Sequence, residues 1–148
     1  MKGCFFIGHR DAPDTIYKQL INHIEKCITE YGVQSFVVGH YGNFDRLSAR
    51  AVIAVKKYHP HIKLFLLLPY HPAERRVKMP AGFDGTYYPE GMETVPRRIA
   101  IVRANRYMVD HSDCLIVYAW HPASNAKNLL EYALQREKKG KIKVLSLV

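Results

Sequence analysis

The sequence has no long apolar segment. Its longest uninterrupted apolar run, residues 64 to 69, is far shorter than the ~20 residues that a membrane-spanning helix needs. The first residues also lack the basic start and the following apolar stretch that mark a secretory signal. We therefore expect no membrane span, no export and no membrane partner.

Cysteine is scarce, and no two cysteines have a CxxC spacing. Cys4, Cys27 and Cys114 all lie in apolar segments. An odd number of thiols in such segments is typical of buried cysteines in a reducing compartment, so we expect a cytoplasmic location. The sequence also has no HxxxH or HxxE spacing on an expected helix, and we predict neither a metal site nor a cofactor.

Acidic residues are outnumbered by basic ones. The chain has 22 Lys and Arg residues against 13 Asp and Glu residues, which gives a net charge of +9. This excess favours an acidic partner such as nucleic acid, a nucleotide or an anionic surface. Five of the basic residues crowd the C-terminal end, which is either a solvated helix end that attracts cations or a nucleic-acid footprint. These residues are Arg136, Lys138, Lys139, Lys141 and Lys143.

Hydrophobic residues are abundant, at 48% of the 148 residues, so the chain can bury the core of one domain spanning residues 1–148. Short apolar runs alternate with segments whose apolar residues recur every three or four positions, a pattern of strands and helices. The expected strands cover residues 4–7, 35–38, 62–68, 113–118 and 142–148, and the expected helices cover 17–31, 45–58, 94–110 and 124–139. This alternation predicts an α/β fold, a three-layer Rossmann-like domain with a parallel sheet of about five strands.

One connection is unusually long. In residues 69–93 the periodicity fails, and proline, glycine and tyrosine accumulate. Connections of this length are uncommon in compact domains. The segment is either a lid or substrate loop, or an ordered excursion without a function of its own.

Glycine and histidine follow the expected strands, whose ends read GHR, GHYG, PYHP and WHP. Ligands of parallel sheets bind outside the carboxyl ends of the strands. Glycines there let the chain turn sharply and let backbone N–H groups approach an anion at a helix N-terminus, while the histidines can donate hydrogen bonds to a ligand or line a polar rim. These candidate binding residues are Gly8, His9, Arg10, Gly39, His40, Gly42, His71 and His121.

Two standard phosphate-binding motifs, GxGxxG and GxxxxGK[ST], are absent. Three other segments, in order along nearly the whole chain, are IGHR (7–10), VGHYGNFD (38–45) and RANRYMVDHSD (103–113). Together they resemble the YpsA-like branch of the SLOG superfamily. That superfamily has a Rossmann-like fold and includes the DNA-processing protein DprA, the lonely-guy phosphoribohydrolases and nucleotide sensors of bacterial conflict systems.

The resemblance implies one ligand cleft that is built from two loops and a helix. Arg10 can pair bidentately with a phosphate, and Asp45 can either accept a hydrogen bond from a ribose hydroxyl or cap its helix. The helix segment that contains Arg103, Asn105 and Arg106 either approaches the cleft or is an exposed helix face. The residues that the resemblance places at the cleft are Gly8, His9, Arg10, Gly39, Gly42, Asp45, Arg103 and Asn105.

The enzymes of the superfamily carry a PGGxGTxxE element after the fourth strand, and this chain departs from it. The corresponding segment, residues 121–131, contains no glycine, although Glu131 falls at the acidic position. Ser124 and Asn125, at the start of the last helix, can still hold an anion. The departure argues against phosphoribohydrolase activity.

Three functions are compatible with these residues. The first, which we expect, is binding of a nucleotide or nucleotide-derived small molecule by a sensor or sequestering module. The second is hydrolysis of the N-glycosidic bond of a nucleoside monophosphate, with Glu131 as acid or base and with Arg10 and Arg103 on the phosphate. The third is single-stranded nucleic-acid binding, for which the charge and stacking on tyrosines would serve. The family analogy is also compatible with a homo-oligomer. The tyrosines are Tyr41, Tyr70, Tyr87 and Tyr88.

Overall fold

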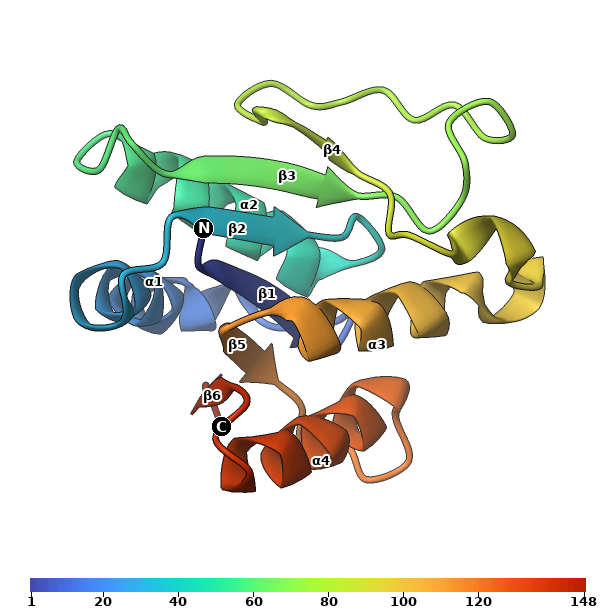
Figure 1. The fold of residues 1–148 in the computed structure, drawn as a ribbon. Coiled ribbons are helices and arrows are strands. Elements are labelled where there is room, and N and C mark those ends of the chain that lie inside the picture. Colours follow the sequence, from blue (N-terminus) through green and yellow to red (C-terminus); the bar gives the residue numbers. More distant parts are fainter.

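A computed structural model describes residues 1–148 as three layers, with a parallel sheet between two pairs of helices (Figure 1). The strands are β1 (Gly3–Gly8), β2 (Ser35–Val38), β3 (Lys63–Leu67), β4 (Gly85–Tyr87), β5 (Cys114–Tyr118) and β6 (Lys143–Ser146). The α-helices are α1 (Tyr17–Tyr31), α2 (Asn43–Lys56), α3 (Ala100–His111) and α4 (Asn125–Lys138). The strand order in the sheet is β4-β3-β2-β1-β5-β6, and every pairing is parallel. The predicted α/β, Rossmann-like architecture is confirmed.

The alternation of side chains along each strand builds one core on each face of the sheet. In β1, Cys4 and Phe6 pack with α1 and α2, whereas Phe5 packs with α3 and α4. Because both faces are apolar, the strands are covered by helices on both sides, as is typical of parallel sheets. The three cysteines, Cys4, Cys27 and Cys114, are buried and free.

The helices bury the residues that recur every three or four positions. In α1 these are Leu20, Ile24, Cys27 and Ile28. The helix ends at Gly32, whose φ of 68° is a left-handed conformation that favours glycine. No helix combines the length and the apolarity that crossing a membrane would require.

The long connection contains a strand that was not predicted from the sequence, so the sheet has six strands rather than five. Strand β4 has three residues, and Asp84 fixes its start against β3. The Asp84 carboxylate accepts a hydrogen bond from the Leu64 N–H at 2.8 Å and pairs with Lys56 Nζ at 2.5 Å. A three-residue edge strand that includes a glycine is too short to show an alternating pattern, and tertiary contacts hold it in place.

The helix expected over residues 94–110 begins later, at Ala100. Two 3₁₀ turns, Met92–Thr94 and Arg97–Ile99, precede it. Between them Val95 is extended, with φ −90° and ψ 129°, because the following residue is Pro96 and the position before a proline disfavours the helical region. Elsewhere the ends differ by one or two residues, as in α2 and β6.

Candidate functional site

A cavity of about 330 Å³ lies at the carboxyl ends of the strands. β1 lies between β2 and β5 in the sheet, so the loops after β1 and β5 lead to helices on opposite faces and leave a crevice between them. Apolar side chains of the lining include those of Leu67, Pro69, Ile101 and Val102. The volume lies within the range of small-molecule sites.

The cavity brings together residues from distant parts of the sequence. The loops after β1, β2 and β5, the start of α2 and helix α3 all contribute polar side chains or glycines. Nine of the candidate binding residues line it, namely Gly8, His9, Arg10, Gly39, Gly42, Asp45, Asn105, Ser124 and Asn125, and so does Tyr41, one of the tyrosines considered for stacking.

Arg103 does not line this cavity. With Arg106 it lines a separate groove, beside the 3₁₀ turn at residues 92–94. Positions two apart on a helix do not face the same side, so Asn105 reaches the cavity and Arg103 does not. The expectation that both residues approach one cleft therefore holds for Asn105 alone.

Glu131 also lies outside the cavity. It is exposed, in the second turn of the regular helix α4. Ser124 caps that helix, because its Oγ accepts a hydrogen bond from the Lys127 N–H at 3.1 Å. A catalytic role for Glu131 would need this segment to open as a loop, and the chain is helical there.

The other predicted histidines make local contacts. His71 and His121 each begin an HPA segment, and in both cases Nδ1 accepts a hydrogen bond from the N–H of the alanine two residues later, at 3.0 and 3.3 Å. The ring of His40 lies against that of Tyr41, with 4.3 Å between centroids. None of these three histidines lines the cavity, and the structure holds no cluster of three or more metal-ligating side chains.

His9 is buried between the loops after β1 and β5. Its Nε2 accepts hydrogen bonds from the backbone N–H groups of Trp120 at 2.9 Å and His121 at 3.2 Å. Burial lowers the pKa of His9 below 6.5, the negative charge of Asp11 opposes this, and His121 lowers the pKa further. His9 is therefore neutral at pH 7, and Nδ1 carries its proton.

Two glycines of the site allow close packing between the loop after β1 and the start of α2. A Cβ on Gly8 would lie 2.4 Å from the ring of Phe44, and a Cβ on Gly42 would lie 2.6 Å from Cα of Arg10. Real Cβ atoms do not come so close to a neighbour, so both positions require glycine. This packing is by itself a sufficient physical reason for these glycines, and the expected backbone–anion contact stays a prediction.

Asp45 is the only acidic side chain that lines the cavity. Its Oδ2 accepts a hydrogen bond from the Tyr41 N–H at 3.0 Å, which ties the loop after β2 to the first turn of α2. Gly39 makes room for this carboxylate, since a Cβ there would lie 2.9 Å from the same oxygen. Burial raises the pKa of Asp45 to about 6, against the opposing effects of the Tyr41 N–H and Arg10.

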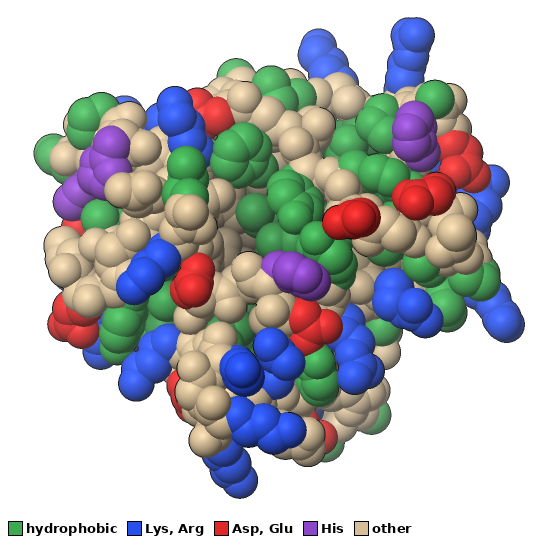
Figure 2. Space-filling model, in the orientation of Figure 1, with side chains coloured by type: hydrophobic (Ala, Val, Ile, Leu, Met, Phe, Trp, Pro, Cys, Tyr) green, Lys and Arg blue, Asp and Glu red, His purple; other side chains and the backbone are tan.

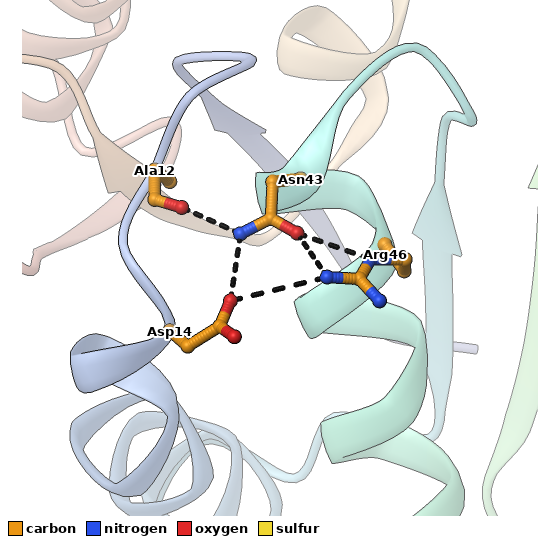
Figure 3. A network of polar contacts seen from close by, with 4 residues as sticks. All are labelled: Ala12, Asp14, Asn43 and Arg46. Carbon is orange, nitrogen blue, oxygen red and sulfur yellow. Dashed lines mark hydrogen bonds and ion pairs between the residues drawn. The ribbon is translucent and has the colours of Figure 1, made fainter.

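A polar network holds the loop after β1 against α2 (Figure 3). The Asn43 side-chain amide donates hydrogen bonds to the Ala12 carbonyl at 2.5 Å and to Asp14 Oδ1 at 2.9 Å. Arg46 donates to Asn43 Oδ1 at 2.6 and 3.0 Å. The backbone N–H of Asn43 also donates to the Arg10 carbonyl at 2.8 Å. Asn43 was not among the predicted site residues, because its partners in the loop after β1, Ala12 and Asp14, lie 31 and 29 residues away.

Four polar side chains of the cavity make no hydrogen bond or ion pair within the chain. They are the exposed Arg10, the half-buried Tyr41, whose hydroxyl has no partner, the half-buried Asn105 and the exposed Asn125 at the start of α4. Arg10 is also the only cationic side chain of the lining. The cavity therefore presents a guanidinium, two amides and the first turn of a helix, all available to hydrogen-bond an anionic or polar ligand.

No protein-family model matches the sequence, and no curated protein matches it. Among solved structures, the fold is similar to that of DNA processing protein A (DprA) from Streptococcus pneumoniae, with a TM-score of 0.65 and 17% sequence identity. The match covers 99% of this chain and 50% of that chain, so this protein spans about half the length of its structural neighbour. The two proteins share a Rossmann-like fold, and the YpsA-like branch stays a prediction.

Proposed function

We propose that the cavity binds a nucleotide or a nucleotide-derived small molecule, and that the protein is a sensor or sequestering module. The observation that carries this proposal is that one cavity contains both the start of α4 and Arg10, whose guanidinium has no partner within the chain. A guanidinium offers two parallel donors to a phosphate, and the free N–H groups of a helix N-terminus favour an anion. The two therefore hold a phosphate between the loops after β1 and β5.

The rest of the lining suits the remainder of a nucleotide. Asp45 lies in the first turn of α2 and is the acceptor for a ribose hydroxyl. Ile101 and Val102 provide apolar side chains for the face of a base, and the Asn105 amide can hydrogen-bond its edge. With one cation and one carboxyl group in the lining, the site suits a ligand of low charge.

Binding without hydrolysis fits the position of Glu131, the residue that falls at the acidic position of the superfamily's enzymes. An acid or base for glycosidic cleavage must lie within proton-transfer reach of the bond. Glu131 is exposed and lies outside the lining. We therefore expect no release of free base from nucleoside monophosphates.

The first experiment is to identify by mass spectrometry any small molecule that purifies with the protein. Calorimetric titration with AMP, GMP, CMP and UMP then compares three variants. Arg10→Ala should weaken binding by about 1.5 to 3 kcal/mol, the value of a charge-assisted hydrogen-bonded contact. Arg103→Ala is the matched control, since it removes an exposed arginine outside the cavity, and it should leave the affinity unchanged.

The third variant, Glu131→Gln, separates binding from catalysis. It should bind as the wild type does, and chromatography should detect no free base from either protein. Equal affinity for wild type and Arg10→Ala would remove Arg10 from the site. Steady base release by the wild type that is abolished in Glu131→Gln would establish the hydrolase instead.

Single-stranded nucleic-acid binding is a second candidate, and stacked arginine–tyrosine pairs favour it. The guanidinium of Arg75 lies 4.3 Å from the ring centre of Tyr70, and that of Arg106 lies 4.2 Å from the ring centre of Tyr132. Lys and Arg side chains also gather over α4 in Figure 2. A labelled oligothymidine should then bind with an affinity that falls steeply with salt, and Arg106→Ala should weaken it. Anisotropy that stays flat at low salt would exclude this function.

A further inference from the structure

His9 joins two loops of the cavity through backbone contacts. It is 8% exposed, and its backbone N–H donates a hydrogen bond to the Tyr118 carbonyl at 3.2 Å. In return, its Nε2 accepts from the N–H groups of Trp120 and His121, at 2.9 and 3.2 Å. One side chain therefore holds the chain that leaves β5 and leads, within four residues, to the cap of α4.

The two hydrogen bonds exist only in one protonation state. An imidazole nitrogen that accepts hydrogen bonds carries no proton, so His9 is neutral with its proton on Nδ1. Protonation of Nε2 would aim an N–H at two backbone N–H groups and remove their acceptor. Three N–H groups would then face one another with like partial charges, so the loop moves, and the backbone N–H groups of the exposed residues Trp120 and His121 hydrogen-bond to water instead.

We propose that His9 is a proton-sensitive latch, which in its neutral form holds residues 119–124 against β1 and on protonation releases them. The release does not depend on any ligand. A consequence that rests on the proposed function is that Ser124 and the first turn of α4 then move away from Arg10, so phosphate binding is lost.

The groups around His9 set the pH at which the latch opens. Burial lowers its pKa, Asp11 on the same loop raises it, and His121 on the opposite loop lowers it. The rings of Tyr118 and Trp120 lie edge-on to the imidazole, with centroids at 5.8 and 5.4 Å. The transition is therefore expected below pH 6.5, the ordinary value for histidine.

The state of His9 can be read without a ligand. Long-range ¹H–¹⁵N NMR of the intact protein at pH 8 should show Nδ1 protonated and Nε2 bare. On acidification the backbone amide signals of Trp120 and His121 should shift with the same midpoint as the His9 ring. A proton on Nε2 at pH 8, or a ring that titrates while both amides stay unchanged, would overturn the latch.

Trp120, the only tryptophan of the chain, gives a second readout. Its emission should change between pH 8 and pH 5 in the wild type. The change should vanish in His9→Gln, whose side-chain oxygen can accept the same N–H groups but does not titrate. His121→Gln is the control, since that ring lies equally close to Trp120, at 5.4 Å, and the change should persist. The opposite pattern would assign the transition to His121, and the wild-type NMR titration decides even if a variant does not fold.

Calorimetry with AMP then separates the latch from the proposed function. Wild type should bind AMP at least about tenfold more weakly at pH 5 than at pH 8, and the affinity of His9→Gln for AMP should fall distinctly less over the same range. The phosphate and Asp45 titrate in both proteins, so the difference between them belongs to His9. No AMP binding at either pH, with the NMR transition intact, would count against the proposed function and leave the latch standing. Equal losses in both proteins would refute the coupling of the latch to the cavity.

Discussion

Replacing Asp45 by asparagine should stabilise the protein at neutral pH. Asparagine keeps an oxygen for the 3.0 Å hydrogen bond from the Tyr41 N–H and removes the buried negative charge. A pKa raised from 3.8 to about 6 means that ionised Asp45 costs the folded state about 3 kcal/mol, at 1.36 kcal/mol per pH unit. This figure is the upper limit of the gain expected for Asp45→Asn.

The sign of the effect depends on pH. Because the folded-state pKa is raised, neutral Asp45 favours the fold, and this contribution is complete below pH 3.8 and is lost as the pH rises through about 6. The free energy of unfolding of Asp45→Asn should therefore equal that of wild type near pH 4 or below and exceed it by up to about 3 kcal/mol at pH 8. Urea unfolding followed by circular dichroism at pH 4, 6 and 8 measures this difference.

Asp45→Asn should also bind AMP more weakly. A carboxylate that is present although its charge destabilises the fold is typical of a functional site. Glu131→Gln, which changes an exposed acidic residue outside the cavity, is the control and should show neither effect. A stability difference that stays constant from pH 4 to pH 8, or a less stable Asp45→Asn at pH 8, would refute the argument from burial.

Two further changes test the packing of the site and of β4. Gly42→Ala should lower the free energy of unfolding by about 1–3 kcal/mol, as for overpacking, because the new Cβ would lie 2.6 Å from Cα of Arg10. Gly3→Ala, where a Cβ would lie 3.6 Å from its nearest neighbour, should lower the free energy of unfolding by less, as measured in the same urea titration. Burial raises the pKa of Asp84, but the ion pair with Lys56 and the hydrogen bond from β3 outweigh it and hold the pKa below 3.8. Asp84→Ala should therefore cost about 1–3 kcal/mol at pH 7, and the loss should shrink as the pH falls through that lowered pKa; a loss that stays constant while the Asp84 carboxylate is protonated would contradict this account.

The order of the elements and the division of the core could be predicted from the sequence, because both follow from local periodicity. Alternation in β1 assigns Phe5 to one face and Cys4 and Phe6 to the other, and the three-and-four spacing in α1 identifies its buried side. Parallel strands bring their carboxyl ends to one edge, and nine of the candidate residues line one cavity there, whereas His40, His71 and His121 do not. The divergence of Arg103 from Asn105 was also readable, since positions two apart on a helix face different sides.

Other features depend on contacts between residues far apart in the sequence, and only the tertiary structure decided them. Strand β4 exists because Asp84 docks on β3, twenty residues upstream. The requirement for Gly42 comes from Arg10, and the neutral state of His9 comes from two N–H groups more than one hundred residues away. The raised pKa of Asp45 likewise reflects burial between elements. Packing distance, hydrogen-bond partners and desolvation are properties of the assembled chain, and no local pattern of residues encodes them.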